Sequence, residues 1–310
     1  LKKHPYSDHS ITFELMFRHL LRLCFLLIIT SSQAQPVFDV LQTQYVESPA
    51  SAIYKGGDEA ECTIGYFQAQ ANLPWKHNLR HITIFNPIYE ARSFRISTPL
   101  GTSVQRYLSG ALSVSHRMLF RDTTHHLLAA LAIRHYGANG ITPSENSITP
   151  AVALLYGRQQ SEKFTWRLGA YYSRECFGNF WLPLLGFDWQ ASKNFRCWGI
   201  LPRYAVFDYA ITPRVHSCLF YKGITDSYRE KGNDYFTYIE GQVRIGLEYY
   251  LSHTPLVFTA DAGHSASRNF ISYSDLLQEE TEISPTEGLL FRIGISWRVV
   301  TDQSFRAPHL

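Results

Sequence analysis

Nine ionisable side chains occupy alternating positions within otherwise apolar segments, and their types and spacing could do chemistry. They are four bases and five acids: Arg167, Arg244, Arg292 and Arg298, with Asp188, Asp208, Glu240, Glu248 and Asp261. Such residues either form ion pairs that fill a narrow interior or line a pore and set its ion selectivity. The near balance of charge favours pairing, because an unpaired charge in a low-dielectric interior costs several kcal/mol. We predict in particular that Asp261 pairs with Arg292.

Three groups of neighbouring serine and histidine residues are candidates for nucleophilic catalysis. They are His264 with Ser265 or Ser267, His216 with Ser217, and Ser115 with His116. A nucleophile needs its base within hydrogen-bond reach. Adjacent residues of a strand point to opposite faces, so most of these pairs cannot meet. The sequence also lacks a Gly-rich phosphate loop and an H-E-x-x-H motif. We therefore expect that the protein is not an enzyme.

The residues that often bind metals are not arranged for it. Behind the export signal described below, Cys62, Cys176, Cys197 and Cys218 show no metal-type spacing and no C-x-x-C. We interpret them as small strand residues, and His125-His126 as a solvated turn. The net charge of +3 is small and scattered, which argues against nucleic acid. The sequence thus predicts neither a metal nor a cofactor.

Strands must position these residues, and Ile239 to Leu251 is the clearest of them. Its odd positions are apolar apart from Gly241, and its even positions include Glu240, Arg244 and Glu248. This alternation indicates a strand with two unlike faces. Its length exceeds the usual five or six residues of a soluble strand and suits a tilted strand that crosses a bilayer. The segment Leu289 to Val299 repeats the pattern, with Trp297 near its end.

Twelve further segments read as strands, which brings the predicted number to fourteen. They are Val37–Val46, Ala60–Ala71, Asn78–Tyr89, Val104–Leu119, His126–Tyr136, Ile148–Gly157, Phe164–Ser173, Trp181–Ala191, Phe195–Ile200, Tyr204–Ile211, Arg214–Tyr221 and Pro255–His264. The division at Pro202 rests on the rarity of proline inside central strands.

Short and long connections mostly alternate along the chain. The long ones are predicted at Glu90–Ser103, Gly137–Ser147, Lys222–Thr237 and Ser265–Gly288. Membrane barrels have short periplasmic turns and long external loops, so the alternation is typical of that class. The last loop is acidic, and we interpret its charges as a solvated surface. Aromatic residues make up 15% of the chain although its mean hydropathy is only −0.16, which also suits such barrels.

The beginning of the chain is interpreted as an export signal. Met16 to Arg22 is basic, Leu20 to Ile29 is largely apolar, and Ser32-Gln33-Ala34 is a small-residue cleavage site. We predict that residues 16–34 are a signal peptide, that cleavage leaves Gln35 first, and that residues 1–15 precede the true start. The barrel is expected at 35–300, and 301–310 form a C-terminal tail.

Residues Trp181 to Trp189, W-L-P-L-L-G-F-D-W, carry a resemblance to a known family. With Trp198 to Pro202 and Phe207-Asp208-Tyr209, they resemble a family of Gram-negative outer-membrane β-barrel proteins known only as a domain of unknown function. The likeness covers most of the mature chain loosely and residues 181 to 209 best. It implies a fold and a location but no activity. The tail Ser304 to Leu310 departs from the usual pattern because it lacks a terminal aromatic residue.

Together these features predict an all-β protein, an antiparallel up-and-down transmembrane barrel of about 12–14 strands in the cell outer membrane. We expect it to be non-enzymatic, either structural or a small-solute channel, with the nine ionisable residues lining its lumen. Its expected partners are outer-membrane lipid, lipopolysaccharide, the barrel assembly machinery and small solutes. The alternatives are a barrel enzyme that modifies lipid or lipopolysaccharide and a secreted soluble β-barrel that binds a ligand.

Overall fold

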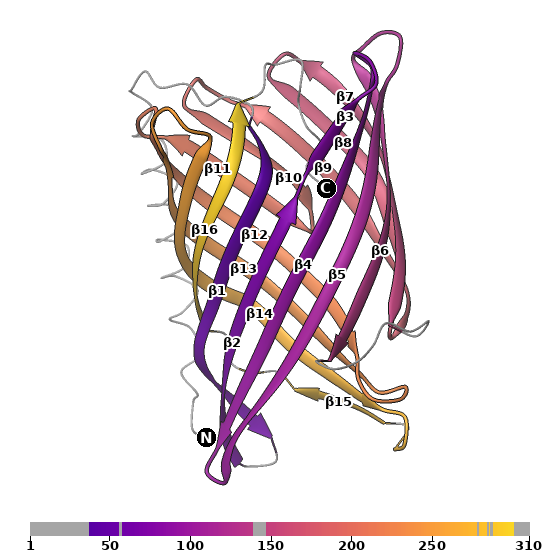
Figure 1. The fold of residues 1–310 in the computed structure, drawn as a ribbon, viewed down its shortest axis with the longest axis vertical. Coiled ribbons are helices and arrows are strands. Elements are labelled where there is room, and N and C mark those ends of the chain that lie inside the picture. Colours follow the sequence, from indigo (N-terminus) through magenta and orange to yellow (C-terminus); the bar gives the residue numbers. More distant parts are fainter. Residues whose placement is uncertain are drawn as a thin grey trace, which may run out of the picture.

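The computed structural model describes residues 37–55, 58–138, 147–277, 279–283, 285 and 288–300. These residues form a closed antiparallel barrel of fourteen strands (Figure 1). The fold class and the strand number predicted from the sequence are therefore confirmed. The predicted signal peptide and the tail at 301–310 lie outside the described residues. The described part contains no helix of the length and apolar character needed to cross a membrane.

The barrel strands follow one another around the wall in chain order. They are β1 (Val37–Lys55), β2 (Asp58–Ala71), β4 (His81–Thr98), β5 (Gly101–Leu119), β6 (His125–Ala138), β7 (Ile148–Ser161), β8 (Phe164–Glu175), β9 (Gly178–Gln190), β10 (Phe195–Leu201), β11 (Tyr204–Ala210), β12 (Val215–Arg229), β13 (Tyr235–Tyr250), β14 (Leu256–Ser274) and β16 (Leu289–Val300). Two short strands, β3 (Leu73–Lys76) and β15 (Glu279–Ile283), pair with β4 and β14. Pairing of β1 with β16 closes the barrel.

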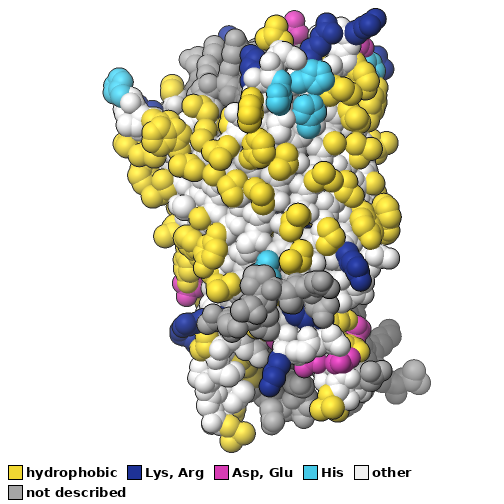
Figure 2. Space-filling view, turned by 45° about the vertical axis from the view of Figure 1, so that its right-hand side comes forward, with side chains coloured by type: hydrophobic (Ala, Val, Ile, Leu, Met, Phe, Trp, Pro, Cys, Tyr) yellow, Lys and Arg dark blue, Asp and Glu magenta, His cyan; other side chains and the backbone are white. Residues whose placement is uncertain are grey.

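Apolar and charged residues alternate between the two sides of the wall, because successive side chains of a strand point to opposite faces. In β13, Ile245 is 60% exposed and Arg244 only 4%. In β16, Ile293 is 64% exposed and Arg292 only 8%. The faces predicted for both strands are therefore confirmed. On the face that Figure 2 shows, apolar side chains cover much of the upper part and are fewer among the described residues below.

The two ends of the barrel differ in their connections. We call upper the end at which β1 begins and β16 ends, as in Figure 1, and lower the opposite end. Five connections are predicted from the sequence to be short, and all of them lie at the upper end: Phe120–His125, Arg158–Lys163, Ser192–Asn194, Thr212–Pro213 and Ser252–Thr254. The predicted division at Pro202 is a tight turn at the lower end, where Arg203 N donates to the Ile200 carbonyl oxygen at 2.9 Å.

Three of the predicted long loops are wrong, because their residues are mostly strand. Only Pro99 and Leu100 separate β4 from β5, while β12 continues to Arg229 and β14 to Ser274. The error has a physical cause. Outside the apolar band, outward residues such as Glu61, Arg95 and Arg106 are exposed and polar, so the expected apolar face is missing. Buried, inward-facing residues still recur there at every second position. The fourth predicted loop, Gly137–Ser147, lies mostly outside the described residues.

Near the lower end, fewer strands form the wall of the barrel. Lys222 pairs with Tyr204, the first residue of β11, and β12 continues past this lower end of β11. After His135 pairs with Ile148, β6 continues beyond β7. The two strands then meet in a parallel bridge between Arg229 and Gly137. Strands β7 to β11 therefore take no part in the lowest section of the wall.

An aromatic cluster fills this lower section, and we call it the lower core. It comprises Cys62, Ile64, Phe94, Tyr107, Tyr136, Ile224, Tyr228, Phe236, Tyr238 and Phe270. The ring of Phe94 meets those of Tyr107, Phe236 and Phe270 at centroid distances of 5.7, 5.1 and 5.4 Å. These edge-to-face arrangements are favourable for aromatic pairs. The lower core therefore packs like the interior of a small soluble barrel.

Candidate functional site: the charged interior

The structure places all nine predicted ionisable residues on the inner face of the wall. Eight of them are at most 8% exposed: Arg167, Asp188, Asp208, Glu240, Arg244, Glu248, Asp261 and Arg292. The ninth, Arg298, has a side chain that is 8% exposed. A buried charge needs a counter-charge or hydrogen bonds, so the arrangement of these groups decides what the interior can do.

Asp261 joins two arginines in the middle of the barrel. Its carboxylate lies 2.5 Å from Arg292 Nη2 and 2.9 Å from Arg244 Nε. The register explains the first contact, since Asp261 stands directly opposite Arg292 on β14 and β16. Gly246 stands opposite Asp261 on β13, where a Cβ atom would lie 2.2 Å from that of Asp261. The predicted ion pair is present, with Arg244 as a second partner.

Arg298 links two acids near the upper end. Its Nε lies 2.5 Å from Asp39 Oδ1, and its Nη2 donates to Glu248 Oε1 at 3.2 Å. Its Nη1 also donates to the Tyr250 hydroxyl at 2.8 Å. Asp39 belongs to β1 and Glu248 to β13, so one guanidinium connects strands that are not neighbours. Such a connection fixes the shape of the upper interior.

The other four predicted residues contact side chains that were not predicted to line the lumen. The contacts are Asp188 with Arg196 at 3.0 Å, Asp208 with His216 at 2.9 Å, Glu240 with Arg268 at 2.7 Å, and Arg167 Nε with His126 Nε2 at 3.2 Å. His126, which was interpreted as part of a solvated turn, is instead a buried residue of β6. Arg196 binds both oxygens of Asp188. In the β9–β10 hairpin Trp198 stands opposite Asp188, which places Arg196 diagonally from it. Arg196 lies two residues from Trp198 and therefore on the same face of β10, so the period-two pattern could have identified it as an interior residue.

Five interior charges were missed for a different reason. Glu90, Arg92, Lys222, Asp226 and Arg268 lie in the segments that were predicted as long loops. Arg92 and Asp226 form an ion pair at 2.9 Å. Glu90 accepts hydrogen bonds from Gln68 at 2.8 Å and Ser109 at 3.1 Å. Continuing the period-two pattern of β4 and β12 would have found the first four. Arg268 also requires the bulge in β14 between Ser265 and Ser267, which shifts the inward positions by one residue.

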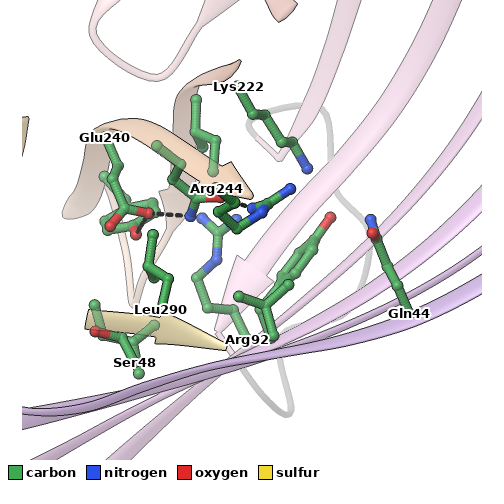
Figure 3. A pocket seen from close by; sticks show the side chains of 13 residues that line it. Gln44, Ser48, Arg92, Lys222, Glu240, Arg244 and Leu290 are labelled. Atoms are coloured by element: carbon green, nitrogen blue, oxygen red, sulfur yellow. Dashed lines mark hydrogen bonds between the residues drawn. The ribbon is translucent and has the colours of Figure 1, made fainter. Parts of the chain in front are cut away.

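A cavity of ≈ 20 Å³ lies within this interior, and we call it the central cavity. Its lining includes Gln44, Tyr66, Arg92, Lys222, Glu240 and Arg244. In Figure 3 the side chains of Arg92, Lys222 and Arg244 enter the same space from different strands. A cavity of this size holds about one water molecule. Side chains therefore fill the rest of the described interior at this height.

The candidate Ser–His pairs are mostly separated by the wall. His216 and Ser115 point inward, and their partners Ser217 and His116 point outward. His264 and Ser267 do share the outer face, because the register of β14 shifts between Ser265 and Ser267. This bulge was not foreseen in the sequence. Ser265 is buried on the inner side.

Metal-ligating residues are not gathered in the part of the chain that the structure describes. No group of three or more His, Cys, Asp or Glu side chains there has an arrangement that could hold a metal ion. Cys62, Cys176, Cys197 and Cys218 are not joined in disulfides. Cys62, Cys197 and Cys218 are buried within strands, in keeping with their interpretation as small strand residues, whereas Cys176 lies in the β8–β9 turn and is only half-buried.

Comparisons with known proteins leave the chain without an assigned family. No family model matches it, and no curated protein matches it. The resemblance of residues 181–189 to an uncharacterised barrel family therefore stays a prediction. Among solved structures, an outer-membrane channel from Pseudomonas putida F1 is similar with 11% identity and a TM-score of 0.46, over 87% of this chain and 99% of that one.

Two further solved structures show a weaker similarity. The translocator domain of the autotransporter NalP from Neisseria meningitidis has 10% identity and a TM-score of 0.35, over 95% of this chain and 99% of that one. The TodX monoaromatic hydrocarbon channel has 10% identity and a TM-score of 0.37, over 86% and 91%. Values this low assign no function, and the fold assignment rests on the strand pairing described above.

Proposed function

We propose that this chain is an integral outer-membrane β-barrel, non-enzymatic, whose interior is closed by ion pairs and aromatic packing. One observation carries the proposal: above the lower section, the outer face of the wall is apolar and the inner face is charged. A soluble barrel has the reverse distribution. Strand β16 is representative, since its exposed residues Leu289 to Val299 are apolar over the roughly 9–11 residues that a tilted strand needs to cross a bilayer.

The distribution of turns supports an orientation. Short turns lie at the upper end, which we assign to the periplasm, and the polar lower section faces the exterior. In this orientation the outward Glu61, Arg95 and Arg106 would lie beyond the apolar band, level with lipopolysaccharide. The barrel assembly machinery would be the partner that inserts the chain.

The packing of the interior favours a structural role over an open porin. The lower core closes one section, and the contacts of Asp261 and Arg298 bridge the barrel above it. The central cavity holds about one water molecule, far less than a solute path requires. A small-solute channel is the second candidate, and the polar lining of the central cavity is the observation that favours it.

Single-channel recording in a planar bilayer tests the closed interior. The refolded protein should show no steady conductance at physiological salt, and long-lived open steps like those of a porin would contradict the proposal. Washing membranes with carbonate tests the insertion. The protein should stay in the membrane pellet, whereas its release would favour the secreted soluble alternative.

The enzymatic alternative has its own test. Refolded protein would be incubated with outer-membrane lipids, and the lipids would be followed by mass spectrometry. We expect no change in acyl chains or headgroups. Turnover that disappears in Ser267→Ala would instead establish a lipid-modifying enzyme, because Ser267 and His264 share the outer face.

A further inference from the structure

We propose that the central cavity is a binding site for a small monovalent anion, with chloride as the representative ligand, and that Lys222 is its principal contact. The inference goes beyond the proposed function, since it concerns a ligand of the closed interior and requires no conduction. Its basis is the charge around the cavity, the environment of Lys222 and the volume available.

The first step is the charge of the lining. Three cationic side chains, Arg92, Lys222 and Arg244, line the cavity against one acid, Glu240. Glu240 is already committed, because Arg268 Nη2 lies 2.7 Å from its Oε1 and Arg268 Nε donates to the same oxygen at 3.0 Å. The direct lining is therefore positive.

The second step includes the neighbours that neutralise these groups. Arg92 pairs with Asp226 at 2.9 Å, and Asp261 serves both Arg244 and Arg292. The acid Glu90 lies close by and is held by Tyr66, Gln68 and Ser109. The surroundings thus contain five cations against four carboxylates: Arg92, Lys222, Arg244, Arg268 and Arg292 against Glu90, Asp226, Glu240 and Asp261. One negative charge is missing.

The third step identifies the residue that lacks a counter-charge. Lys222 has no carboxylate within ion-pair distance among the described residues, and its Nζ stands 5.1 Å from the centre of the Tyr66 ring. An aromatic face attracts an ammonium group but does not neutralise it. Figure 3 shows the amine of Lys222 directed into the space that Arg244 also enters. An anion there would meet both groups.

The fourth step concerns size and polarity. A volume of ≈ 20 Å³ admits one monatomic ion or one water molecule and excludes polyatomic anions such as phosphate. Gln44, Ser48 and Gln242 also line the cavity and can donate amide or hydroxyl hydrogens. Gln44 Nε2 donates one hydrogen to Gln68 and Gln242 Nε2 donates one to Glu240, so each amide keeps a second hydrogen for a halide, and the Ser48 hydroxyl, which accepts from Arg268, keeps its own. The site is therefore specific for small anions by volume as well as by charge.

The test compares thermal unfolding of the refolded full chain in sodium chloride and in sodium gluconate at equal ionic strength, in non-ionic detergent. Gluconate is too large for the cavity, so the melting temperature should rise with chloride in a saturable manner and stay constant with gluconate. In Lys222→Met the apparent chloride affinity should fall by at least about tenfold, because the nearest unneutralised charge is gone. The matched control, Lys193→Met in the exposed β9–β10 turn, should keep the response.

A second measurement does not depend on the variant folding. The ³⁵Cl NMR line of a chloride solution should broaden with the wild-type protein, and bromide, but not gluconate, should reverse the broadening. Lys222→Gln provides a further variant that keeps a polar side chain. Identical melting temperatures of the wild type in the two salts would overturn the proposal and indicate a water molecule or a neutral lysine. A chloride response retained in both Lys222 variants would overturn it equally.

Discussion

The carboxylate of Asp261 has two cationic neighbours, and this asymmetry determines how each partner responds to removal. Arg292 can be removed while Asp261 keeps Arg244 at 2.9 Å. Removing Asp261 instead leaves two buried guanidinium groups without their shared acid. Breaking a buried pair by removing one partner typically destabilises by about 3–5 kcal/mol.

We predict that Asp261→Ala lowers the unfolding free energy by about 3–5 kcal/mol and Arg292→Ala by clearly less. The double variant should show a coupling of about 0.5–3 kcal/mol, since the residues are in contact. Urea titration of the refolded barrel measures each value. Arg121→Ala, in an exposed turn, is the control and should have little effect. Strict additivity of the two single variants would show that the ion pair does not contribute to stability.

Ile245 tests which face meets lipid. An arginine on the lipid-facing side near the midplane costs about 2–4 kcal/mol. We predict a loss of this size for Ile245→Arg in a folding titration into bilayers. Leu100→Arg is the control, because Leu100 lies fully exposed in the β4–β5 turn beyond the apolar band. Equal losses in the two variants would argue against membrane contact at Ile245. Gly246 cannot serve as the control, since any side chain there meets Asp261.

At the residue scale, the alternation of apolar and polar residues along each strand predicted which ionisable residues face the interior. It did not predict all of their ion-pair partners. Asp261 and Arg292 could be paired from the sequence because they lie on strands that neighbour each other. The contact of Arg298 with Asp39 could not, since it joins residues 259 positions apart and depends on closure of the barrel. Lys222 was missed because the outward residues beside it lose the apolar pattern.

At the scale of elements, the tip of the β8–β9 hairpin covers the junction of β6 and β12. Glu175 accepts hydrogen bonds from Arg134 Nη2 at 2.5 Å and from Ser227 Oγ at 2.9 Å. Cys176 N donates to Ser227 Oγ at 3.0 Å. The Glu175 carboxylate therefore connects β8, β6 and β12 at the place where β6 and β12 become neighbours in the wall.

We predict that Glu175→Ala loosens this tip. A hydrogen bond to a charged group contributes about 1.5–3 kcal/mol, so the open population should rise at least about tenfold. The measurement is the rate at which a maleimide labels Cys176, which is partly exposed, against buried Cys197 as an internal reference. Glu162→Ala, in the exposed β7–β8 turn, is the matched variant. An unchanged rate at Cys176 would mean that the tip is held by other contacts.

Strand boundaries at the lower end show where prediction from sequence fails. Inside the apolar band, outward residues are apolar and inward residues are polar, as expected. The predicted bounds of β7, β13 and β16 are therefore close to the observed ones. Below the band the outward face is polar, and β12 and β14 resemble loops although their inward residues Tyr228 and Phe270 still alternate. The inward pattern alone would have extended β12, whereas in β14 the bulge between Ser265 and Ser267 shifts that pattern by one residue.

At the scale of the whole molecule, the barrel combines an upper section that has an apolar outer face, the proposed membrane section, with a lower section that packs like a soluble domain. Phe94 lies at the centre of the lower core and is 1% exposed. The core draws on β2, β4, β5, β6, β12, β13 and β14 and on none of β7 to β11. The two sections should therefore differ in local stability.

We predict that Phe94→Ala destabilises the lower section by about 3–5 kcal/mol, the usual loss for a buried phenylalanine. Hydrogen exchange should accelerate in the lower parts of β4, β5 and β13 and stay slow around Ile245 in the membrane section. Phe85→Ala on the outer face of the same strand is the control. Uniform acceleration over the whole barrel would show that the two sections unfold as one unit.

The shortness of β10 and β11 has a consequence for the surrounding bilayer. Each has seven residues, fewer than the roughly 9–11 that a tilted strand needs to cross the hydrocarbon layer. Exposed Arg203 sits at their tip, while the neighbouring β9 carries exposed Trp181 further toward the lower end. In the membrane placement proposed above, lipid beside this hairpin would thin to match it, at a fraction of a kcal/mol per Å of mismatch. The membrane around the barrel is therefore expected to be asymmetric in thickness, with its thinnest point beside Arg203.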